Sequence, residues 1–457
     1  MNSCPLCLDV CHDWKGVWWL PGDSDKRMPG ILRYNPKNGL TLSLVFFSDS
    51  YDTLSSPLPS WQLLYGETDG QKITLFDCFP NSPEPKDIAD WMQGNDLYLE
   101  IKVRIALINI HCKINVSFRS IEFSIVGLGK WIGMSAAKSA SKVADFDSLP
   151  DFAVKVKEKD KQVKKEMERE GVYLRVDFSK DLILEEIIKI VRSMQELIAF
   201  ALDNISKLIW IHLEMSENTH KSSDDEKLLR NVDMLYSPVI FDFHDLKKIN
   251  FHHVLFTCDN LSFEKIVPCW FYKYKKLETV INMINSLRYI PSDFVESRLL
   301  TVVGAAEVLH RRLDIDTKPI PEVEFKKMRE NMLKKVPEKY KKRVKATIRN
   351  EQTLRDRLLD LTKRLDKEVI GLFIPDVERW AQGATRARNY LAHEGKASKQ
   401  SLGELVTVIK VTEAIVVLSL LDEIGLSTEC QHAIVRNRPR FKRVHSYATK
   451  YLVPDAK

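Results

Sequence analysis

The chain has 457 residues and a mass of 52.9 kDa, which is too long for one compact core, so we expect two or three domains. Its 44% hydrophobic and 29% charged residues are typical of globular proteins and exclude wholesale disorder and fibrous repeats. The net charge of +6 permits an anionic partner without requiring one, and eight cysteines are too few for a disulfide scaffold.

The N-terminus shows no targeting signal, because it has neither a basic region nor an apolar run before Trp14. The longest apolar stretch, residues 414–421, is bounded by Glu413 and Asp422. It is much shorter than the roughly 20 apolar residues of a membrane span. We therefore expect a soluble, cytoplasmic protein with reduced cysteines and no membrane partner.

The first 150 residues carry the signals of β-strands. Two alternating stretches follow the turn-forming pairs that end in Gly39 and Gly70. The alternating stretches are residues 40–47, 71–77, 97–107 and 118–126. Short strands separated by Gly, Pro and Asn predict a sandwich or barrel-like sheet, which we expect to extend over residues 15–180.

The next region changes its pattern twice. Residues 154–171 are dominated by Lys and Glu, and the mixed signs favour a solvated arm over a nucleic-acid patch. From residue 182 to residue 213 the apolar residues recur with a period near 3.6, which predicts a helix packed on the sheet. We expect a helical portion over residues 181–290, which completes an N-terminal domain of residues 1–290.

Strand signals stop after Pro291, which predicts an all-α domain over residues 291–457. Its expected helices are residues 294–313 after the cap Ser292, then 335–348, 353–367, 376–394 and 401–424. Gly395 is placed to end the fourth of these helices, since glycine accepts the left-handed conformation. The predicted fold class is α+β, a β-rich N-terminal domain with accessory helices followed by an all-α bundle.

The clearest chemical signal is the hexapeptide from Arg388 to His393. An Arg followed five residues later by a His is a weak pattern, and Arg440 with His445 also fits it. The second match follows Pro439 in what looks like a basic tail without apolar periodicity. The first lies at a predicted helix end before a strongly apolar helix, so the context favours it.

Helical geometry relates the side chains of this hexapeptide. At about 100° per residue, His393 lies roughly 40° from Asn389 and roughly 20° from Arg386. Arg388 lies about 140° from His393, so one straight helix does not aim both at one atom. Either the helix end is distorted or a second protomer completes the site.

This motif, at a helix end and before a hydrophobic helix, resembles the active-site motif of HEPN-superfamily ribonucleases. Residues 297–312 resemble the first helix of that domain, with Glu307 at its acidic position, and residues 353–361 resemble the next helix. Residues 18–45 and 64–75 are similar to the N-terminal domain of the ApeA family. These likenesses cover most of the chain, and their joint occurrence is far more specific than either part.

The resemblance implies an ApeA-like anti-phage defence protein with a C-terminal HEPN ribonuclease domain, acting in abortive infection by cleaving RNA, with tRNA as one candidate. RNA carries its own nucleophile, the 2′-OH, so cleavage needs only proton transfer and charge stabilisation. His393 would serve as base or acid, Arg388 would bind the scissile phosphate through two hydrogen bonds, and Asn389 would fix the tautomer of His393. No metal or cofactor is required, and the products would be a 2′,3′-cyclic phosphate and a 5′-OH.

Other residues have competing interpretations. Arg386 is a candidate supporting residue, and Tyr390 either stacks on a base or packs in the core. The basic stretches 326–349 and 436–443 either follow a phosphate backbone or are solvated helix faces.

The N-terminal cysteines raise the question of zinc. Cys4, Cys7, Cys11 and His12 lie within nine residues and would supply four ligands. Adjacent Cys11 and His12 strain tetrahedral ligation, and no second Cys-x-x-Cys pair follows. Ordinary cysteines are therefore preferred over a metal site.

Two other functions stay open: a non-catalytic HEPN module that binds RNA or protein, and the HEPN toxin of a toxin–antitoxin pair. The large N-terminal domain speaks against the toxin, and a phage protein is a candidate trigger sensed by that domain.

We expect a homodimer with a composite site. The helix at residues 401–424 has apolar residues on more than one face, so either a second protomer or the β-rich domain would cover the second face.

Overall fold

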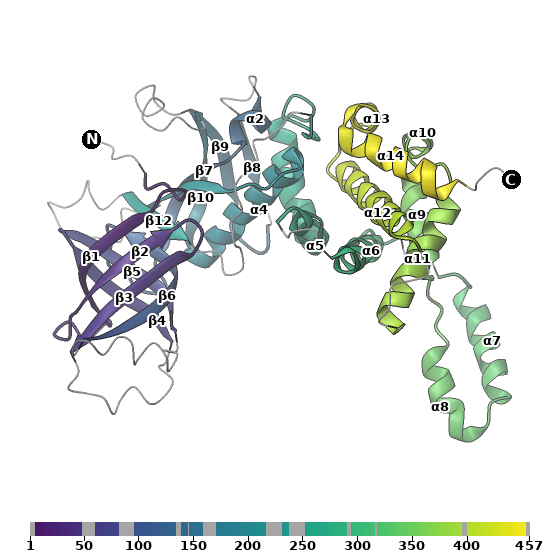
Figure 1. The fold of residues 1–457 in the computed structure, drawn as a ribbon, viewed down its shortest axis with the longest axis horizontal. Helices are drawn as coiled ribbons and strands as arrows, with labels where there is room; N and C mark the ends of the chain where they lie inside the picture. Colours follow the sequence, from purple (N-terminus) through teal and green to yellow (C-terminus); the bar gives the residue numbers. More distant parts are fainter. Residues whose placement is uncertain are drawn as a thin grey trace. The chain divides into compact units, whose positions relative to one another are not determined.

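The computed structural model describes residues 5–47, 60–81, 96–133, 139–144, 146–158, 171–215, 231–236, 252–289, 294–315, 318–394 and 400–453 (Figure 1). The chain divides into two compact units. Unit 1 comprises Met1–Ile249 with Phe256–Phe271, and unit 2 comprises Asn250–Leu255 with Tyr272–Lys457. Among the described helices, none has the length and apolar character that crossing a membrane requires.

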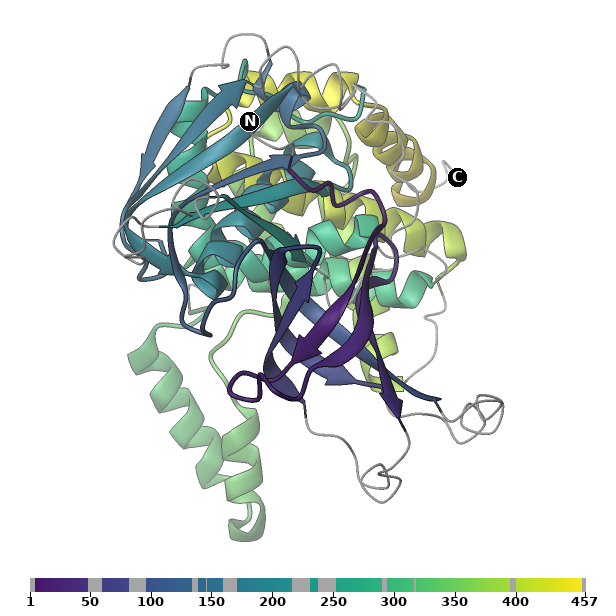
Figure 2. The same ribbon diagram turned by 90° about the vertical axis from the view of Figure 1, so that its left-hand side faces the viewer.

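The described residues of unit 1 form a twelve-stranded antiparallel sheet in the order β3-β2-β1-β4-β5-β6-β12-β11-β7-β10-β9-β8. The strands are β1 His12–Trp19, β2 Met28–Asn35, β3 Gly39–Phe47, β4 Trp61–Thr68, β5 Gln71–Pro80, β6 Asp96–Ile108, β7 Ser117–Ile125, β8 Ala140–Val143, β9 Phe152–Glu158, β10 Val172–Ile183, β11 Leu208–Met215 and β12 Asn231–Tyr236. Because β3 also pairs with β6, the first six strands close into a barrel (Figure 2). The predicted β-rich N-terminal domain is confirmed.

Period-two patterning builds the core of this barrel. Leu40, Leu42 and Leu44 of β3 are at most 1% exposed and alternate with polar residues, so one face of the strand is apolar. The ring of Trp18 fills the space above Gly66, where an added Cβ would lie 2.2 Å from the indole. A glycine is therefore required where these two neighbouring strands, β1 and β4, pass each other.

The second half of the sheet is open and carries helix α4, Leu184–Leu202, against β7 and β10. The predicted helix over residues 182–213 is wrong beyond residue 202, because Asp203 adopts a left-handed conformation with φ of 49° and the chain then enters β11. Buried Ile209, Ile211 and Leu213 fit a period of two, and β7 and β12 flank β11 on both sides. The expected helical portion over 181–290 is thus interrupted by two strands.

Two further boundaries differ from expectation. Residues 154–158 belong to strand β9, and the rest of the predicted solvated arm lies outside the described residues. Helix α5, Phe263–Tyr289, crosses the division between the units at residue 271, whereas the sequence placed a boundary near residue 290.

Unit 2 is all-α over its described residues, as the sequence predicts. Its helices after α5 are α6 Val295–Arg312, α7 Glu322–Lys334, α8 Glu338–Thr347, α9 Leu354–Arg364, α10 Lys367–Gly371, α11 Val377–Glu394, α12 Leu402–Glu423, α13 Thr428–Asn437 and α14 Pro439–Leu452. Reciprocal side-chain caps start two of them, with Thr353 pairing with Asp356 and Ser401 with Glu404. The predicted cap Ser292 lies outside the described residues, and Phe294 directly precedes α6.

The C-terminal helices correct two sequence-based interpretations. The segment after Pro439 is no irregular tail, because Phe441, Val444, Ala448 and Leu452 recur at helical spacing and are at most 4% exposed. Helix α14 packs on α12, which also contacts α6, α9, α11 and α13. The apolar faces of α12 are therefore covered within its own bundle, and the argument that its second face requires a partner is wrong.

Candidate functional site

Helix α11 carries the predicted catalytic motif and is anchored by its opposite face. Trp380, Ala381, Ala384 and Ala387 are at most 1% exposed, and the small alanines allow α6, α9 and α12 to pack closely. The indole nitrogen of Trp380 donates a hydrogen bond to Oγ1 of Thr412 in α12 at 3.2 Å. This packing fixes the rotation of α11 about its axis and so fixes which side chains reach its polar edge.

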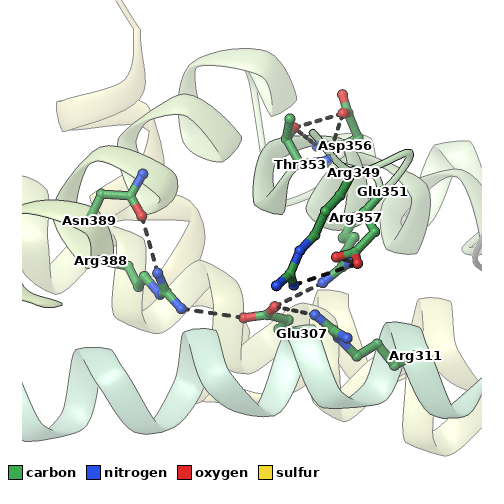
Figure 3. Close-up of polar contacts among 9 residues, drawn as sticks. All are labelled: Glu307, Arg311, Arg349, Glu351, Thr353, Asp356, Arg357, Arg388 and Asn389. Carbon is green, nitrogen blue, oxygen red and sulfur yellow. Dashed lines mark hydrogen bonds and ion pairs between the residues drawn. The ribbon is translucent and has the colours of Figure 1, made fainter. Parts of the chain in front are cut away.

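Arg388 lies at that edge, half-buried between α11 and α6 (Figure 3). Its Nη2 is 3.8 Å from Oε2 of Glu307, and its Nη1 donates to Oδ1 of Asn389 at 3.3 Å. The guanidinium is therefore oriented by a carboxylate from α6 and an amide from its own helix. With a side chain 35% exposed, Arg388 remains accessible to an anion from solvent.

Glu307 is the centre of a cluster of three arginines, as Figure 3 shows. Its Oε1 accepts from Arg357 of α9 at 2.8 Å and from Arg311 at 3.1 Å. Arg357 is only 3% exposed, so its buried charge depends on Glu307 more strongly than the charges of the two more exposed arginines do. One carboxylate faces three guanidinium groups, which leaves a positive excess beside Arg388.

A second ring of charges surrounds this cluster. Nη2 of Arg357 is 4.0 Å from Oε2 of Glu351, whose Oε1 is 3.8 Å from Nη1 of Arg349. The capping box of Thr353 and Asp356 begins α9 directly after this turn and orients Arg357 toward α6 (Figure 3). Charges of alternating sign thus connect the start of α9 to Arg388.

His310 lies one turn after Glu307 on α6 and is fully buried. Its Nε2 is 3.6 Å from Oδ2 of Asp360 in α9. Burial raises the pKa of Asp360, but hydrogen bonds from Lys363 and Gln352 outweigh it and hold that pKa below its usual value. The pair ties α6 to α9, and the fully buried His310 has no access to a substrate.

The structure brings together Arg388, Asn389 and Glu307 of the predicted site. It leaves Arg386 exposed and outside the cluster, and it leaves Tyr390 half-buried. The backbone of His393 belongs to the last turn of α11, one turn after Asn389, while its side chain lies outside the described part of the structure. Because α11 stays helical through residue 394, the distorted helix end considered from the sequence is not observed.

Sequence reasoning missed Arg311 and Arg357. Arg311 carried a signal, since it follows Glu307 by four residues on the same helix face. Arg357 carried none, because its pairing with Glu307 joins two helices and depends on how they pack.

The N-terminal cysteines do not form a metal site within the described residues, where no group of three His, Cys, Asp or Glu residues is placed to hold an ion. Nε2 of His12 is 2.8 Å from the carbonyl oxygen of Cys7. A carbonyl only accepts, so this nitrogen carries a proton and is no metal ligand. Cys11 accepts a weak hydrogen bond from Asn35 at 3.6 Å, and Cys4 lies outside the described residues.

Comparison with known families assigns both parts of the chain. Residues 13–270 match the family described as ApeA N-terminal domain 1, and residues 300–430 match the family described as Apea-like HEPN. The second match contains the whole arginine cluster around Glu307. No match is found among curated proteins or among solved structures.

Proposed function

The chain belongs to the ApeA family, as a defence-related HEPN protein, and from that premise we propose that unit 2 is a metal-independent endoribonuclease triggered by infection. The observation that carries the proposal is the placement of Arg388. It is oriented by Glu307 and Asn389, accessible, and five residues before His393 at the end of one helix.

Arg388 would stabilise the charge that develops on the phosphate. Its planar guanidinium offers paired N–H groups that match two phosphate oxygens. Glu307 keeps this group in place without neutralising it, since Arg357 and Arg311 are the closer partners of the same carboxylate. The excess positive charge attracts a phosphate and stabilises the transition state more than the ground state.

His393 would transfer the protons of the reaction. The 2′-OH loses a proton as it attacks the adjacent phosphorus, and the leaving 5′-oxygen gains one. This yields a 2′,3′-cyclic phosphate and a 5′-OH with no external nucleophile. The pKa of an ordinary histidine lies close enough to neutrality to serve in either step.

Asn389 would connect Arg388 to His393. Its Oδ1 accepts from Arg388, and in this proposal its amide NH₂ donates to His393, which lies one turn further along the helix. An amide donor would bind the unprotonated ring nitrogen. Asn389 would thus couple the orientation of Arg388 to the tautomer of His393.

The active unit in this proposal is a homodimer. On a regular helix Arg388 and His393 point about 140° apart, and α11 remains helical across both residues. Two α11 ends related by a two-fold axis would bring the arginine of one protomer to the histidine of its partner.

The test is cleavage of total RNA by the full-length protein in EDTA, with and without an extract of phage-infected cells. We expect cuts that leave 2′,3′-cyclic phosphate ends in the presence of extract, and none with Arg388→Ala or His393→Ala. Arg379→Ala is the matched control, because it removes an exposed arginine from the start of the same helix, away from both the cluster and His393. Equal loss with all three variants, or cleavage that EDTA abolishes, would contradict the proposal.

A non-catalytic RNA-binding module is the second candidate, since the contact between Arg388 and Glu307 would also suit a structural ion pair. It predicts RNA binding without new ends under every condition.

A further inference from the structure

Helices α7 and α8 form a hairpin that projects from the helical bundle (Figures 1 and 2). We call this hairpin, residues 322–347, the arm. Its two helices pack mainly on each other, and Nη2 of Arg329 donates to the carbonyl oxygen of Lys345 across the hairpin at 2.7 Å. Phe325 is the only buried residue of α7, and α8 buries none. The arm therefore contributes little to the core of unit 2.

The charge of the chain is concentrated in this arm and its base. Residues 322–349 contain eleven lysines and arginines against four glutamates, an excess of seven in a chain whose total charge is +6. Nine of the cations are exposed: Lys326, Lys327, Lys334, Lys335, Lys339, Lys342, Arg343, Lys345 and Arg349. Repulsion among these like charges opposes folding, so the excess of positive charge indicates a binding partner rather than a structural role.

The base of the arm is joined to the candidate site. The backbone N–H of Ile320 donates to Oδ1 of Asn350 at 3.1 Å, and Nδ2 of Asn350 donates back to the Ile320 carbonyl at 2.7 Å. These two bonds close the hairpin. Arg349, the residue before Asn350, begins the series of charges that passes through Glu351 and Arg357 to Glu307, which contacts Arg388.

We propose that the arm binds the sugar-phosphate backbone of a double-helical stem in the substrate RNA and holds the adjoining nucleotides at Arg388. This inference rests on the ribonuclease function proposed above. The charge of the arm and its junction with the site carry it. A polyanion lying along the arm would continue directly onto the arginine cluster.

The composition of the arm favours a stem over a single strand. Tyr340 is its only tyrosine, and the ammonium of Lys339 lies 4.8 Å from the centre of its ring. Proteins that bind single strands stack successive bases on several aromatic side chains. An arm of cations with one exposed aromatic ring contacts phosphates instead, which positions RNA without reading its sequence.

The test measures RNA binding separately from cleavage, in full-length protein carrying His393→Ala. In this background four arm lysines are replaced together: Lys327→Gln, Lys334→Gln, Lys335→Gln and Lys342→Gln. Two matched variants serve as controls. One makes the same number of Lys→Gln changes at exposed positions of unit 1, namely Lys26, Lys37, Lys72 and Lys113, and the other places arginine at the four arm positions.

Fluorescence anisotropy with a labelled stem-loop RNA, over a series of KCl concentrations, gives the dissociation constant and its salt dependence. We expect the arm Gln variant to bind at least about tenfold more weakly at low salt, with the slope of log K against log salt reduced by about three. The arginine variant should bind like the parent, and the unit 1 variant should lose far less. A single strand of equal length should bind more weakly than the stem-loop. Thermal unfolding midpoints should not fall, since these side chains are exposed and removing like charges relieves repulsion within the arm.

Each contrary result is decisive. Equal affinity and slope for the arm Gln variant and its parent would remove the arm as an RNA site, and so would equal losses from the arm and unit 1 variants. Unchanged RNA binding with lost protection in infected cells would assign the arm to a protein partner and overturn the proposal. Equal affinity for the single strand would overturn the preference for a stem. Arm-dependent binding in a protein that never cuts RNA would keep the arm as an RNA-binding surface but remove the ribonuclease function, and with it the delivery of substrate to Arg388.

Discussion

Helices α11 and α14 carry the same spacing of arginine and histidine in very different surroundings. In α14, Nη2 of Arg440 is 2.8 Å from Oε1 of Glu413, and the two side chains are 15% and 13% exposed. In α11, Arg388 is 3.8 Å from Glu307, and the exposed fractions are 35% and 23%. Arg440 is therefore committed to a tight ion pair, whereas Arg388 shares its carboxylate with two closer arginines.

This difference shows that the spacing of arginine and histidine alone does not identify a catalytic site. The sequence favoured Arg388 for two reasons. The position at a helix end before an apolar helix is confirmed, whereas the irregular tail expected around Arg440 is wrong, since α14 is a regular amphipathic helix. What distinguishes the two arginines is how each is paired and how far it is exposed. A phosphate would have to break the ion pair of Arg440, whereas it would add to the contacts of Arg388.

The largest expected contrast lies between the two histidines. His393→Ala should lower the rate of RNA cleavage by about 1,000-fold or more, because both proton transfers depend on this group. His445→Ala should leave the rate of RNA cleavage unchanged, since His445 is an exposed residue of α14. Timed cleavage assays with both purified variants measure this. A loss of activity with His445→Ala would move the site to α14.

The arginines should separate activity from stability. Arg388→Ala is expected to lower the cleavage rate by about 100- to 1,000-fold, the effect of removing one hydrogen-bond donor to the transition state. Arg388→Lys should recover little of this rate, because an ammonium group lacks the paired N–H donors of a guanidinium. Arg440→Ala should instead lower the thermal midpoint, because it removes the partner 2.8 Å from Glu413 and leaves Arg298 at 4.0 Å. Full cleavage by Arg388→Lys, together with restored stability in Arg440→Lys, would mean that each arginine acts only as a point charge. The distinction between a phosphate-binding Arg388 and a structural Arg440 would then be wrong.

Glu307→Gln tests whether the cluster is held by its carboxylate. Arg357 would lose its closest partner while staying buried, and Glu351 at 4.0 Å would compensate only in part. We expect a loss of about 2–3 kcal/mol of unfolding free energy, below the usual cost of breaking a fully buried pair. Urea unfolding of this variant beside Glu413→Gln gives the comparison. An unchanged midpoint for Glu307→Gln would mean that solvent already screens the charge of Arg357.

Local patterns determined most of the fold, and packing determined the rest. The strand at residues 40–47 and the helices at 376–394 and 401–424 were predictable because their periods are unambiguous. Strand β11 was not, since its short apolar run fits two periods and its pairing with β7 makes the choice. At the site, Arg388 was identified from its spacing to a histidine and Glu307 from the likeness of its helix to the first HEPN helix. The role of Arg357 was not predictable, because its contact with Glu307 depends on the packing of α6 against α9.

The smallest expected effect concerns the composite site. Equal amounts of Arg388→Ala and His393→Ala protein, mixed under conditions that let protomers exchange, should form mixed dimers as half of all dimers. Each mixed dimer would contain one site with an intact arginine and an intact histidine, and one site with neither. Cleavage should therefore return to about one quarter of the wild-type rate, because a two-fold interface pairs each residue with its counterpart on the partner. Light scattering of the wild type at twice the chain mass is the accompanying control. Dimers that exchange freely and yet stay inactive would mean that both residues act within one protomer, so the last turn of α11 would have to rearrange when RNA binds.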